Sequence, residues 1–429
     1  HKQRHRPIPD HSKRGRKAQM KPICHSSVLV FLLLGCTPEP QPIYPIPQPE
    51  NLDKVEETRV LQAVQEAQQE VGDKPHSAEA WANLGKIYIA HDWYEAAAVC
   101  YGHAAEFDPD EFRWHFFLGR SHIHTDAATA IESFERAIAI DDNYAPAYIY
   151  GALALRKLQR FDQAKQYLRL AAKLDSKNPY AQLQLGELSL MDKQFETAHQ
   201  HLQQALKLNP GQSEAHSALA QVNMALGDKP KAMEHAQAAR LISTITPMED
   251  ELWAEIQLAG VSRRWFRKRG NQYLRDGKIK EAVHEFAVAL EEDPIDPELW
   301  LNYGVALLRV KRVAEARTAL ERSLAQTRPA DAPISPDTRS MTSADIAKLY
   351  VNLAVAAIGQ KDLKAAEHHF KEALKINSNS FEAAFNLALL TSSQGQISQA
   401  IFYLEKAYAI RPDPKIPPLI EKIRRETRL

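Results

Sequence analysis

Histidine and cysteine are the side chains of this 429-residue chain that could hold a metal or attack a substrate, so their spacing comes first. The closely spaced histidines fall into three groups: His115, His122 and His124; His199 and His201; His368 and His369. None of these groups has a supporting Cys, Asp or Glu at a recognisable ligand spacing, which favours histidines on solvated helix surfaces over a metal site. The sequence therefore predicts no metal and no cofactor.

The three cysteines, Cys24, Cys36 and Cys100, form no disulfide framework and no CxxC or CxxCH spacing. Cys100 lies among alanines, which indicates a small buried side chain; the alternative, a nucleophile, has no supporting histidine. The chain also carries no HExxH, glycine-rich phosphate loop, GxSxG or kinase signature. We therefore expect no enzyme, and a function that depends on binding.

A cluster of positive charge lies in the stretch SRRWFRKRGNQYLRDG, within a chain whose 54 Lys and Arg balance 54 Asp and Glu. The balance excludes a global field for nucleic acid or an anionic membrane. The six cations of the stretch are Arg263, Arg264, Arg267, Lys268, Arg269 and Arg275. Crowded on one expected helix, they predict a local anion site. A solvated basic face is the alternative interpretation.

A repeat of about 34 residues must position these side chains. One position of the repeat is alanine in every unit: Ala97, Ala130, Ala164, Ala198, Ala232, Ala282, Ala316, Ala366 and Ala400. They are 33 or 34 residues apart except for two gaps of 50, and a second small residue follows each by seven. Two antiparallel helices approach closely only where small residues face the crossing, so the pattern predicts stacked helix pairs.

The first unit, AEAWANLGKIYIAHDWYEAAAVCYGHAAEFDPDE, resembles the tetratricopeptide repeat. The matching residues are Trp81, Leu84, Gly85, Tyr88, Ala97, Tyr101, Ala104 and Pro109. The resemblance implies an all-α, right-handed superhelical solenoid of helix-turn-helix repeats, with a concave peptide-binding surface made by the first helices. The residues expected to pack the repeats are Trp81, Gly85, Ala97, Gly186, Ala198, Trp300 and Gly304. The fifth unit has His216, Asn223 and Ala236 at usually larger apolar positions, and should pack less tightly.

The repeat also gives the expected domain organisation. Each of the two interruptions adds 16 residues. The first interruption predicts an extra helix with Thr246 as its N-cap, and this helix would divide the solenoid in two. The second interruption is rich in proline and predicts an exposed loop. Amphipathic helices are expected at both ends as caps. The expected boundaries are a capping helix at 51–76, five repeats at 78–246, the extra helix at 247–262, four repeats at 263–414 with a loop at 331–346, and a closing helix at 415–429.

Five residues of the second array resemble the carboxylate clamp of repeat-family co-chaperones: Arg267, Asn271, Asn302, Lys348 and Asn352. The resemblance implies that Arg267 and Lys348 supply charge to a terminal carboxylate while the asparagines orient it. Arg267 replaces a lysine of the clamp and Asn352 an arginine, and the loop falls between the seventh and eighth units. The expected partner is a protein or peptide with an acidic C-terminus; a solvated basic face is again the alternative.

An apolar run, VLVFLLLGC, precedes the array and ends at Cys36; it is too short to span a bilayer. Counted from Met20, a lysine, this run and the cysteine follow the order of a secretory signal. Residues 33–36 resemble the bacterial lipoprotein box, which implies that Cys36 is lipidated. Residues 1–35 would then be the signal region, with 1–19 either a long n-region or, as we favour, upstream sequence translated in error. The alternative is a disordered tail with one exposed apolar patch.

Two function classes follow. The first is a membrane-anchored scaffold that binds proteins or peptides in envelope assembly or secretion, with no nucleic-acid partner, and with residues 37–50 as a proline-rich tether. Thr37 follows the cysteine where an aspartate would favour retention in the inner membrane, so the outer membrane, facing the periplasm, is the expected location. The second class is a regulatory or scaffolding subunit of an enzyme or glycosylation complex whose catalytic part lies elsewhere.

Overall fold

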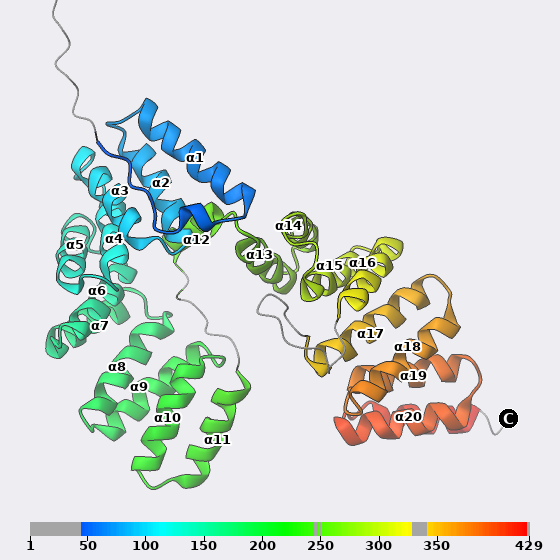
Figure 1. The fold of residues 1–429 in the computed structure, drawn as a ribbon. Helices are drawn as coiled ribbons and strands as arrows, with labels where there is room; N and C mark the ends of the chain where they lie inside the picture. Colours follow the sequence, from blue (N-terminus) through cyan, green and yellow to red (C-terminus); the bar gives the residue numbers. More distant parts are fainter. Residues whose placement is uncertain (1–43, 243–247, 249, 328–340, 427–429) are drawn as a thin grey trace, which may run out of the picture. The chain divides into compact units, whose positions relative to one another are not determined.

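The computed structural model describes residues 44–242, 248, 250–327 and 341–426, and within them every regular element is a helix. All these helices belong to one compact unit, Pro45–Leu429 (Figure 1). The predicted fold class, an all-α solenoid of helix-turn-helix repeats, is confirmed. The expected signal region, with its lipidation site Cys36, lies outside the described residues.

In the described residues, nine antiparallel helix pairs form two arrays. The N-terminal array pairs α2 (Ala78–Ala90) with α3 (Tyr94–Phe107), α4 (Phe112–His122) with α5 (Ala127–Ile140), α6 (Ala145–Lys157) with α7 (Phe161–Leu174), α8 (Pro179–Met191) with α9 (Phe195–Leu208), and α10 (Ser213–Ala225) with α11 (Lys229–Leu241). The C-terminal array pairs α13 (Arg263–Arg275) with α14 (Ile279–Glu292), α15 (Pro297–Arg309) with α16 (Val313–Gln326), α17 (Ser343–Gly359) with α18 (Leu363–Ile376), and α19 (Phe381–Ser393) with α20 (Ile397–Ile410). The described residues form four further elements: η1 (Leu52–Lys54), α1 (Thr58–Asp73), α12 (Glu251–Ala259) and α21 (Ile416–Glu426).

The first helices of neighbouring pairs contact each other directly, as α8 does α10 and α15 does α17. We call the surface that they form the first-helix face of each array. In the N-terminal array it is made by α2, α4, α6, α8 and α10, and in the C-terminal array by α13, α15, α17 and α19.

The repeated alanines hold each pair together. All nine alanines that define the repeat are at most 2% exposed. Their partners seven residues later are fully buried in eight repeats, and the exception is Ala239 of the fifth repeat, which is half-buried. On the same helix, α11, Met233 and Leu241 are largely exposed. The fifth repeat is therefore the most loosely packed end of the N-terminal array, as its small and polar residues indicated.

In eight of the nine described helix pairs, the turn inside the pair uses a left-handed backbone conformation. The residues with positive φ in these turns are Asp92, Gln159, Lys193, Gly227, Gly277, Lys311, Lys361 and Gly395. The second repeat is one residue shorter, and its fully described turn has no such residue; the amide of Asp126 instead donates to the carbonyl of His122 at 2.8 Å. The deletion therefore removes the left-handed residue and leaves the helix pair intact.

Helices cover both ends of the described chain. Helix α1 packs on α2 through Val60, Val64 and Val71, which are almost fully buried. Helix α21 packs on α20, with Ile416 and Ile423 in the core of the last two repeats. Both helices lie inside the segments expected to cap the arrays.

Two segment boundaries need correction. The tether was expected to run free to residue 50, but Pro49 is buried and the carbonyl of Pro47 accepts a hydrogen bond from Tyr88 Oη at 2.9 Å, because that buried hydroxyl needs an acceptor. The loop expected at 331–346 ends earlier, because Thr342 caps α17 by accepting from the amide of Asp345 at 3.1 Å.

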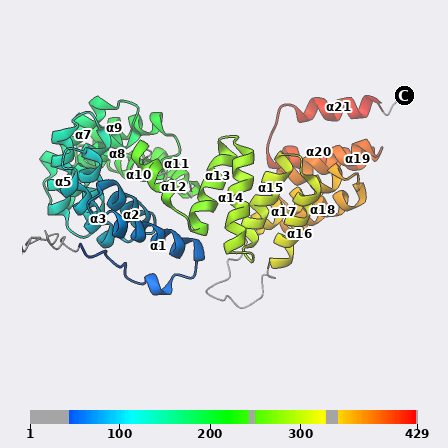
Figure 2. The same ribbon diagram turned by 90° about the horizontal axis from the view of Figure 1, so that it is seen from above.

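The extra helix is present as α12, but its start and its position differ from expectation. Asp250 is its N-cap and accepts from the amide of Trp253 at 2.6 Å; the expected cap, Thr246, lies outside the described residues. The helix packs against α2, the first helix of the first repeat, and lies beside it in both views of the ribbon (Figures 1 and 2). It therefore returns to the start of the N-terminal array.

Candidate functional site

The first-helix face of the C-terminal array carries a repeated side-chain pattern. Each of its four helices has an asparagine followed three residues later by an apolar residue: Asn271 and Leu274, Asn302 and Val305, Asn352 and Val355, Asn386 and Leu389. Residues three apart share one side of a helix. Val355 and Leu389 are 40% and 41% exposed, although apolar. The face therefore offers alternating amides and apolar surface.

The structure brings two of the five clamp-like residues into contact, and a third, Arg267, lies about one turn before Asn271 on α13. Asn302 Nδ2 donates to Asn271 Oδ1 at 3.3 Å, across α15 and α13. Arg267 lies on the same helix as Asn271, and its Nη1 faces Asp296 at 3.6 Å and Glu298 at 3.7 Å. Its charge is therefore already compensated by two carboxylates of the chain.

The other two clamp-like residues lie together on α17. Lys348 is largely exposed and its Nζ pairs with Asp345 at 3.1 Å. Asn352 Nδ2 donates to the carbonyl of Lys348 at 2.8 Å, one turn earlier. Among the described contacts, none joins this pair to Arg267, Asn271 or Asn302.

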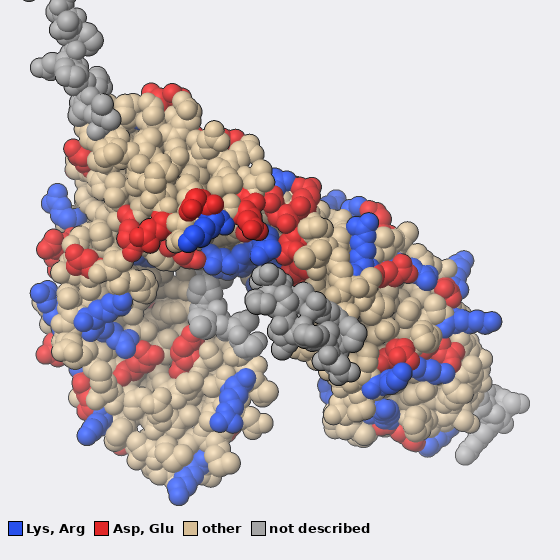
Figure 3. Space-filling view, in the orientation of Figure 1, with Lys and Arg blue, Asp and Glu red and all other residues tan. Residues whose placement is uncertain are grey.

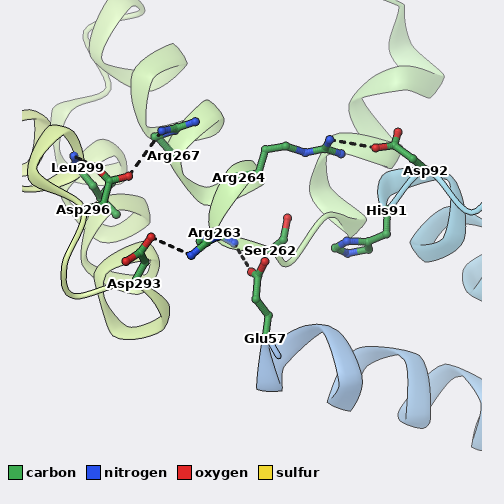
Figure 4. A pocket seen from close by; sticks show the side chains of 10 residues that line it. All are labelled: Glu57, His91, Asp92, Ser262, Arg263, Arg264, Arg267, Asp293, Asp296 and Leu299. Carbon is green, nitrogen blue, oxygen red and sulfur yellow. Dashed lines mark hydrogen bonds and ion pairs between the residues drawn. The ribbon is translucent and has the colours of Figure 1, made fainter. Parts of the chain in front are cut away.

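A polar pocket of about 330 Å³ lies beside α13 (Figure 4). Arginines of α13 line it, each engaged with a carboxylate: Arg263 with Asp293 at 2.9 Å and Arg264 with Asp92 at 2.9 Å. Opposite charges also intermingle on the surface around α1, α12 and α13 (Figure 3). Because each of these guanidinium groups already pairs with a carboxylate, the pocket offers little free positive charge to an anion. The pair of Arg264 with Asp92 also links the sixth repeat to the first.

The same pocket contains a titratable side chain. Burial, reinforced by Arg264 and opposed by Asp92, lowers the pKa of His91 to about 4. His91 is therefore neutral at pH 7.

Lys268 of α13 lies 4.5 Å from the ring centre of Trp265. Burial lowers the pKa of Lys268.

The chain itself covers the first-helix face of the N-terminal array over α2, α4 and α6. Met248 joins Tyr148 and Ala181 in a buried apolar cluster of the third and fourth repeats. Two residues on, Asp250 Oδ1 accepts a hydrogen bond from Tyr144 Oη at 2.9 Å. The covering segment then continues as α12, whose Leu252 and Ile256 are buried.

Basic side chains of the same face meet α12. Glu255 pairs with Lys86 of α2 at 3.0 Å and with Arg113 of α4 at 3.9 Å. The guanidinium of Arg120, also on α4, lies 4.6 Å from the ring centre of Trp253 and 4.1 Å from that of Tyr150. The segment thus runs across three first helices, from α6 through α4 to α2.

Beyond α12, the chain stays attached to the first repeat. Trp265 Nε1 donates to the carbonyl of Ala90 at 2.6 Å, and the ring is buried. A Cβ on Gly260 would lie 2.3 Å from this ring, so the end of α12 requires glycine.

Where the segment meets the face, three polar atoms are buried without a hydrogen-bond partner. They are Arg120 Nη1 on the face, and Asp250 Oδ2 and Trp253 Nε1 on the segment. Each such atom costs about 1–3 kcal/mol. The fit between α12 and the face is therefore incomplete. Leu252 and Ile256 are four residues apart, which is the spacing of one side of a helix, but no sequence signal identifies Lys86, Arg113 and Arg120 as partners of α12.

The residues expected to pack the repeats lie at close helix contacts. A Cβ on Gly85 would lie 2.8 Å from Tyr101, and one on Gly186 or Gly304 would lie 2.6 Å from Leu202 or Leu320. Trp81, Ala97 and Ala198 are fully buried. Trp300 Nε1 donates to the carbonyl of Pro294 at 2.8 Å, as Trp81 Nε1 does to that of Pro75 at 2.9 Å.

Cys100 is buried in α3, and burial raises the pKa of its thiol. Within the described ranges, no group of three or more His, Cys, Asp or Glu is placed to hold a metal ion. No helix in the part of the chain that the structure describes has the length and apolarity to cross a membrane.

Comparison with known proteins gives the family. Models described as tetratricopeptide repeat match residues 78–111, 147–178, 189–243, 267–332 and 345–413, together more than half of the chain.

Individual relatives are more distant. RNA polymerase II-associated protein 3 of Xenopus laevis is 26% identical over 27% of the chain and 15% of that protein. The DnaJ homolog subfamily C member 7 homolog of Schizosaccharomyces pombe is 23% identical over 63% of the chain and 60% of that protein. Among solved structures, YrrB, a TPR protein with an unusual peptide-binding site, is 19% identical with a TM-score of 0.36 over 42% of this chain and 94% of that chain. The chain spans less than two thirds of either relative.

Proposed function

Because the chain belongs to the tetratricopeptide repeat family, we propose that it is a non-catalytic scaffold that binds a segment of a partner protein on the first-helix face of its C-terminal array. The observation that carries this proposal is the asparagine and apolar pattern on α13, α15, α17 and α19. Side-chain amides both donate and accept, so they can pair with a partner's backbone whatever its sequence. The apolar residues beside them would cover its side chains.

Charge on this face selects the partner. Arg275, Arg309 and Lys348 are exposed on α13, α15 and α17. An acidic segment is therefore favoured, and an acidic C-terminus is the finer form of the proposal. A terminal carboxylate at Arg267 would have to compete with Asp296 and Glu298.

The test uses peptides selected from a random library on the purified chain. The double variant Val355→Glu, Leu389→Glu should weaken binding at least tenfold, about 1.4 kcal/mol, since it places carboxylates on the apolar part of the face and repels an acidic segment. Phe402→Glu is the matched control, because Phe402 is an exposed apolar residue on a second helix, α20. Equal losses in both variants would contradict the proposed face.

The membrane anchor is a separate part of the proposal. The run that ends at Cys36 supports lipidation of this cysteine, and with it a location at the periplasmic face of the outer membrane and a role in envelope assembly or secretion. Dual acylation holds a protein firmly at a bilayer. The Cys36→Ser chain should lose fatty-acid labelling and leave the membrane fraction. An unchanged membrane fraction would refute the anchor and leave the binding face untouched.

A further inference from the structure

We propose that the first-helix face of the N-terminal array is a second binding site, which takes an acidic, tryptophan-containing helix of a partner protein. The chain's own segment around α12 is its built-in competitor. The proposal rests on the scaffold function proposed above but concerns the other array. It assigns a ligand chemistry to a face that is covered in the structure.

The covering segment shows what the face recognises. Along the segment, Asp250 accepts a hydrogen bond from Tyr144, and the ring of Trp253 lies against the guanidinium of Arg120. Glu255 forms ion pairs with Lys86 and Arg113. These contacts are made by side chains of α4, of α2 and of the residue that caps α6. Charge complementarity therefore favours a helix with acidic residues on both sides of a tryptophan, and apolar residues at the positions of Leu252 and Ile256.

The unpaired atoms show why an external helix could compete. Arg120 Nη1 is buried between Tyr150 and Trp253 without a hydrogen-bond partner, and two atoms of the covering segment, Asp250 Oδ2 and Trp253 Nε1, are also buried without one. A partner helix that presents a carboxylate to Arg120 would gain a charged hydrogen bond that the chain's own segment does not make. The chain's own segment competes for the face at a high effective concentration because it is tethered to it. A partner helix would compete through the additional hydrogen bond.

The experiment measures binding of a labelled peptide with the sequence of residues 248–260, MEDELWAEIQLAG, to the full chain. The wild-type face is already covered, so this peptide should bind weakly. In the Glu255→Lys chain, the new cation faces Lys86 and Arg113, and the segment should leave the face. The peptide, which keeps its glutamate, should then bind at least tenfold more tightly.

Two further variants make the result specific. Glu251→Lys changes the same charge on an exposed position of α12 and should bind the peptide as the wild type does. Adding Lys86→Glu and Arg113→Glu to Glu255→Lys should abolish binding, because the reversed face attracts its own altered segment and repels the acidic peptide.

Other outcomes would overturn the proposal. If the Glu255→Lys chain keeps its helix content and hydrogen-exchange protection in α12, and binds the peptide no better than wild type, α12 is an integral part of the array. If that chain becomes a dimer and excludes the peptide, the face belongs to a second copy. If adding Val355→Glu and Leu389→Glu to the Glu255→Lys chain removes peptide binding, the peptide binds the C-terminal array, which refutes this site and leaves the scaffold function standing.

Discussion

The two arrays share a core and differ in their first-helix faces. Alanines such as Ala97 and Ala316 are fully buried in equivalent positions of both. On the face, however, the N-terminal array presents cations such as Arg113 and Arg120, which the chain's own α12 covers. The C-terminal array presents asparagines and exposed apolar residues, on which the described residues place no other segment.

This difference shows that the repeat constrains the contact between paired helices and leaves the face free to vary. Each array can therefore hold a different kind of segment. Because repeat arrays are close to one-dimensional, a change in one array should also stay local.

The largest expected effect tests whether the arrays are independent. In the Gly186→Leu chain, the new side chain would enter the space of Leu202, since even a Cβ would lie 2.6 Å from Leu202 Cγ. Overpacking of this kind costs about 1–3 kcal/mol. Hydrogen exchange should show loss of protection in the N-terminal array and little change in residues 263–414.

Gly304→Leu is the matched variant in the other array, because its Cβ would lie equally close to Leu320. It should loosen the C-terminal array and spare α2 to α11. Uniform loss of protection along the chain in either variant would show that the arrays unfold together.

A second effect concerns the pocket beside α13. The pKa of His91 is lowered to about 4 from its ordinary value of 6.5. A histidine with a lowered pKa contributes stability that is present above pH 6.5 and is lost as the pH falls towards 4, since the unfolded chain takes up the proton first. Between pH 7 and pH 5 this amounts to about 2 kcal/mol.

The measurement compares denaturant unfolding of wild type and His91→Gln at both pH values. The wild type should lose about 2 kcal/mol more than the variant, because Arg264 and Asp92, the charged groups that shift this pKa, are retained in both chains. Identical pH dependence in the two chains would show that His91 is not a source of it.

The sequence was sufficient to predict the helix pairs, because their spacing follows from small residues that the crossing requires. It also placed extra helices in the segments that now contain α1, α12 and α21. It could not predict where α12 packs, because Leu252 and Ile256 show only that one side of the helix is buried. The helices that α12 meets, α2 and α4, are far away along the chain.

The candidate site was predicted less completely, for a related reason. The positions of Arg267, Asn271 and Asn302 follow from the repeat register, and two of these side chains do meet. The pairing of Arg267 with Asp296 depends on the start of the next repeat, where Asp296 also caps α15 by accepting from the amide of Leu299 at 3.0 Å. A count of cations in the sequence gave no sign of this compensation.

A third and smaller effect tests the covered face. Asp250→Ala removes the cap of α12 and the hydrogen bond with Tyr144. Loss of an N-cap costs about 1 kcal/mol. Faster hydrogen exchange in residues 251–259 is expected, with the C-terminal array unchanged. If exchange in α12 stays as slow as in the wild type, the contacts of Leu252, Ile256 and Glu255 hold the helix in place without its cap.

The smallest expected effect tests the uncovered face. Glu298→Gln removes one of the two carboxylates near Arg267, and the glutamate side chain is about half exposed. Because exposed ion pairs are worth about 0.2–1 kcal/mol, the gain in affinity for an acidic peptide with a free C-terminus should be about 1.4- to fivefold. Glu315→Gln is the control, since Glu315 is similarly exposed and pairs with Arg312 beside the second helix α16. A gain that is equal for free and amidated peptides would show that Arg267 contributes general charge and does not bind the terminal carboxylate. A gain for the free peptide alone would assign the carboxylate to Arg267 and so fix the direction in which the partner lies across α13, α15 and α17.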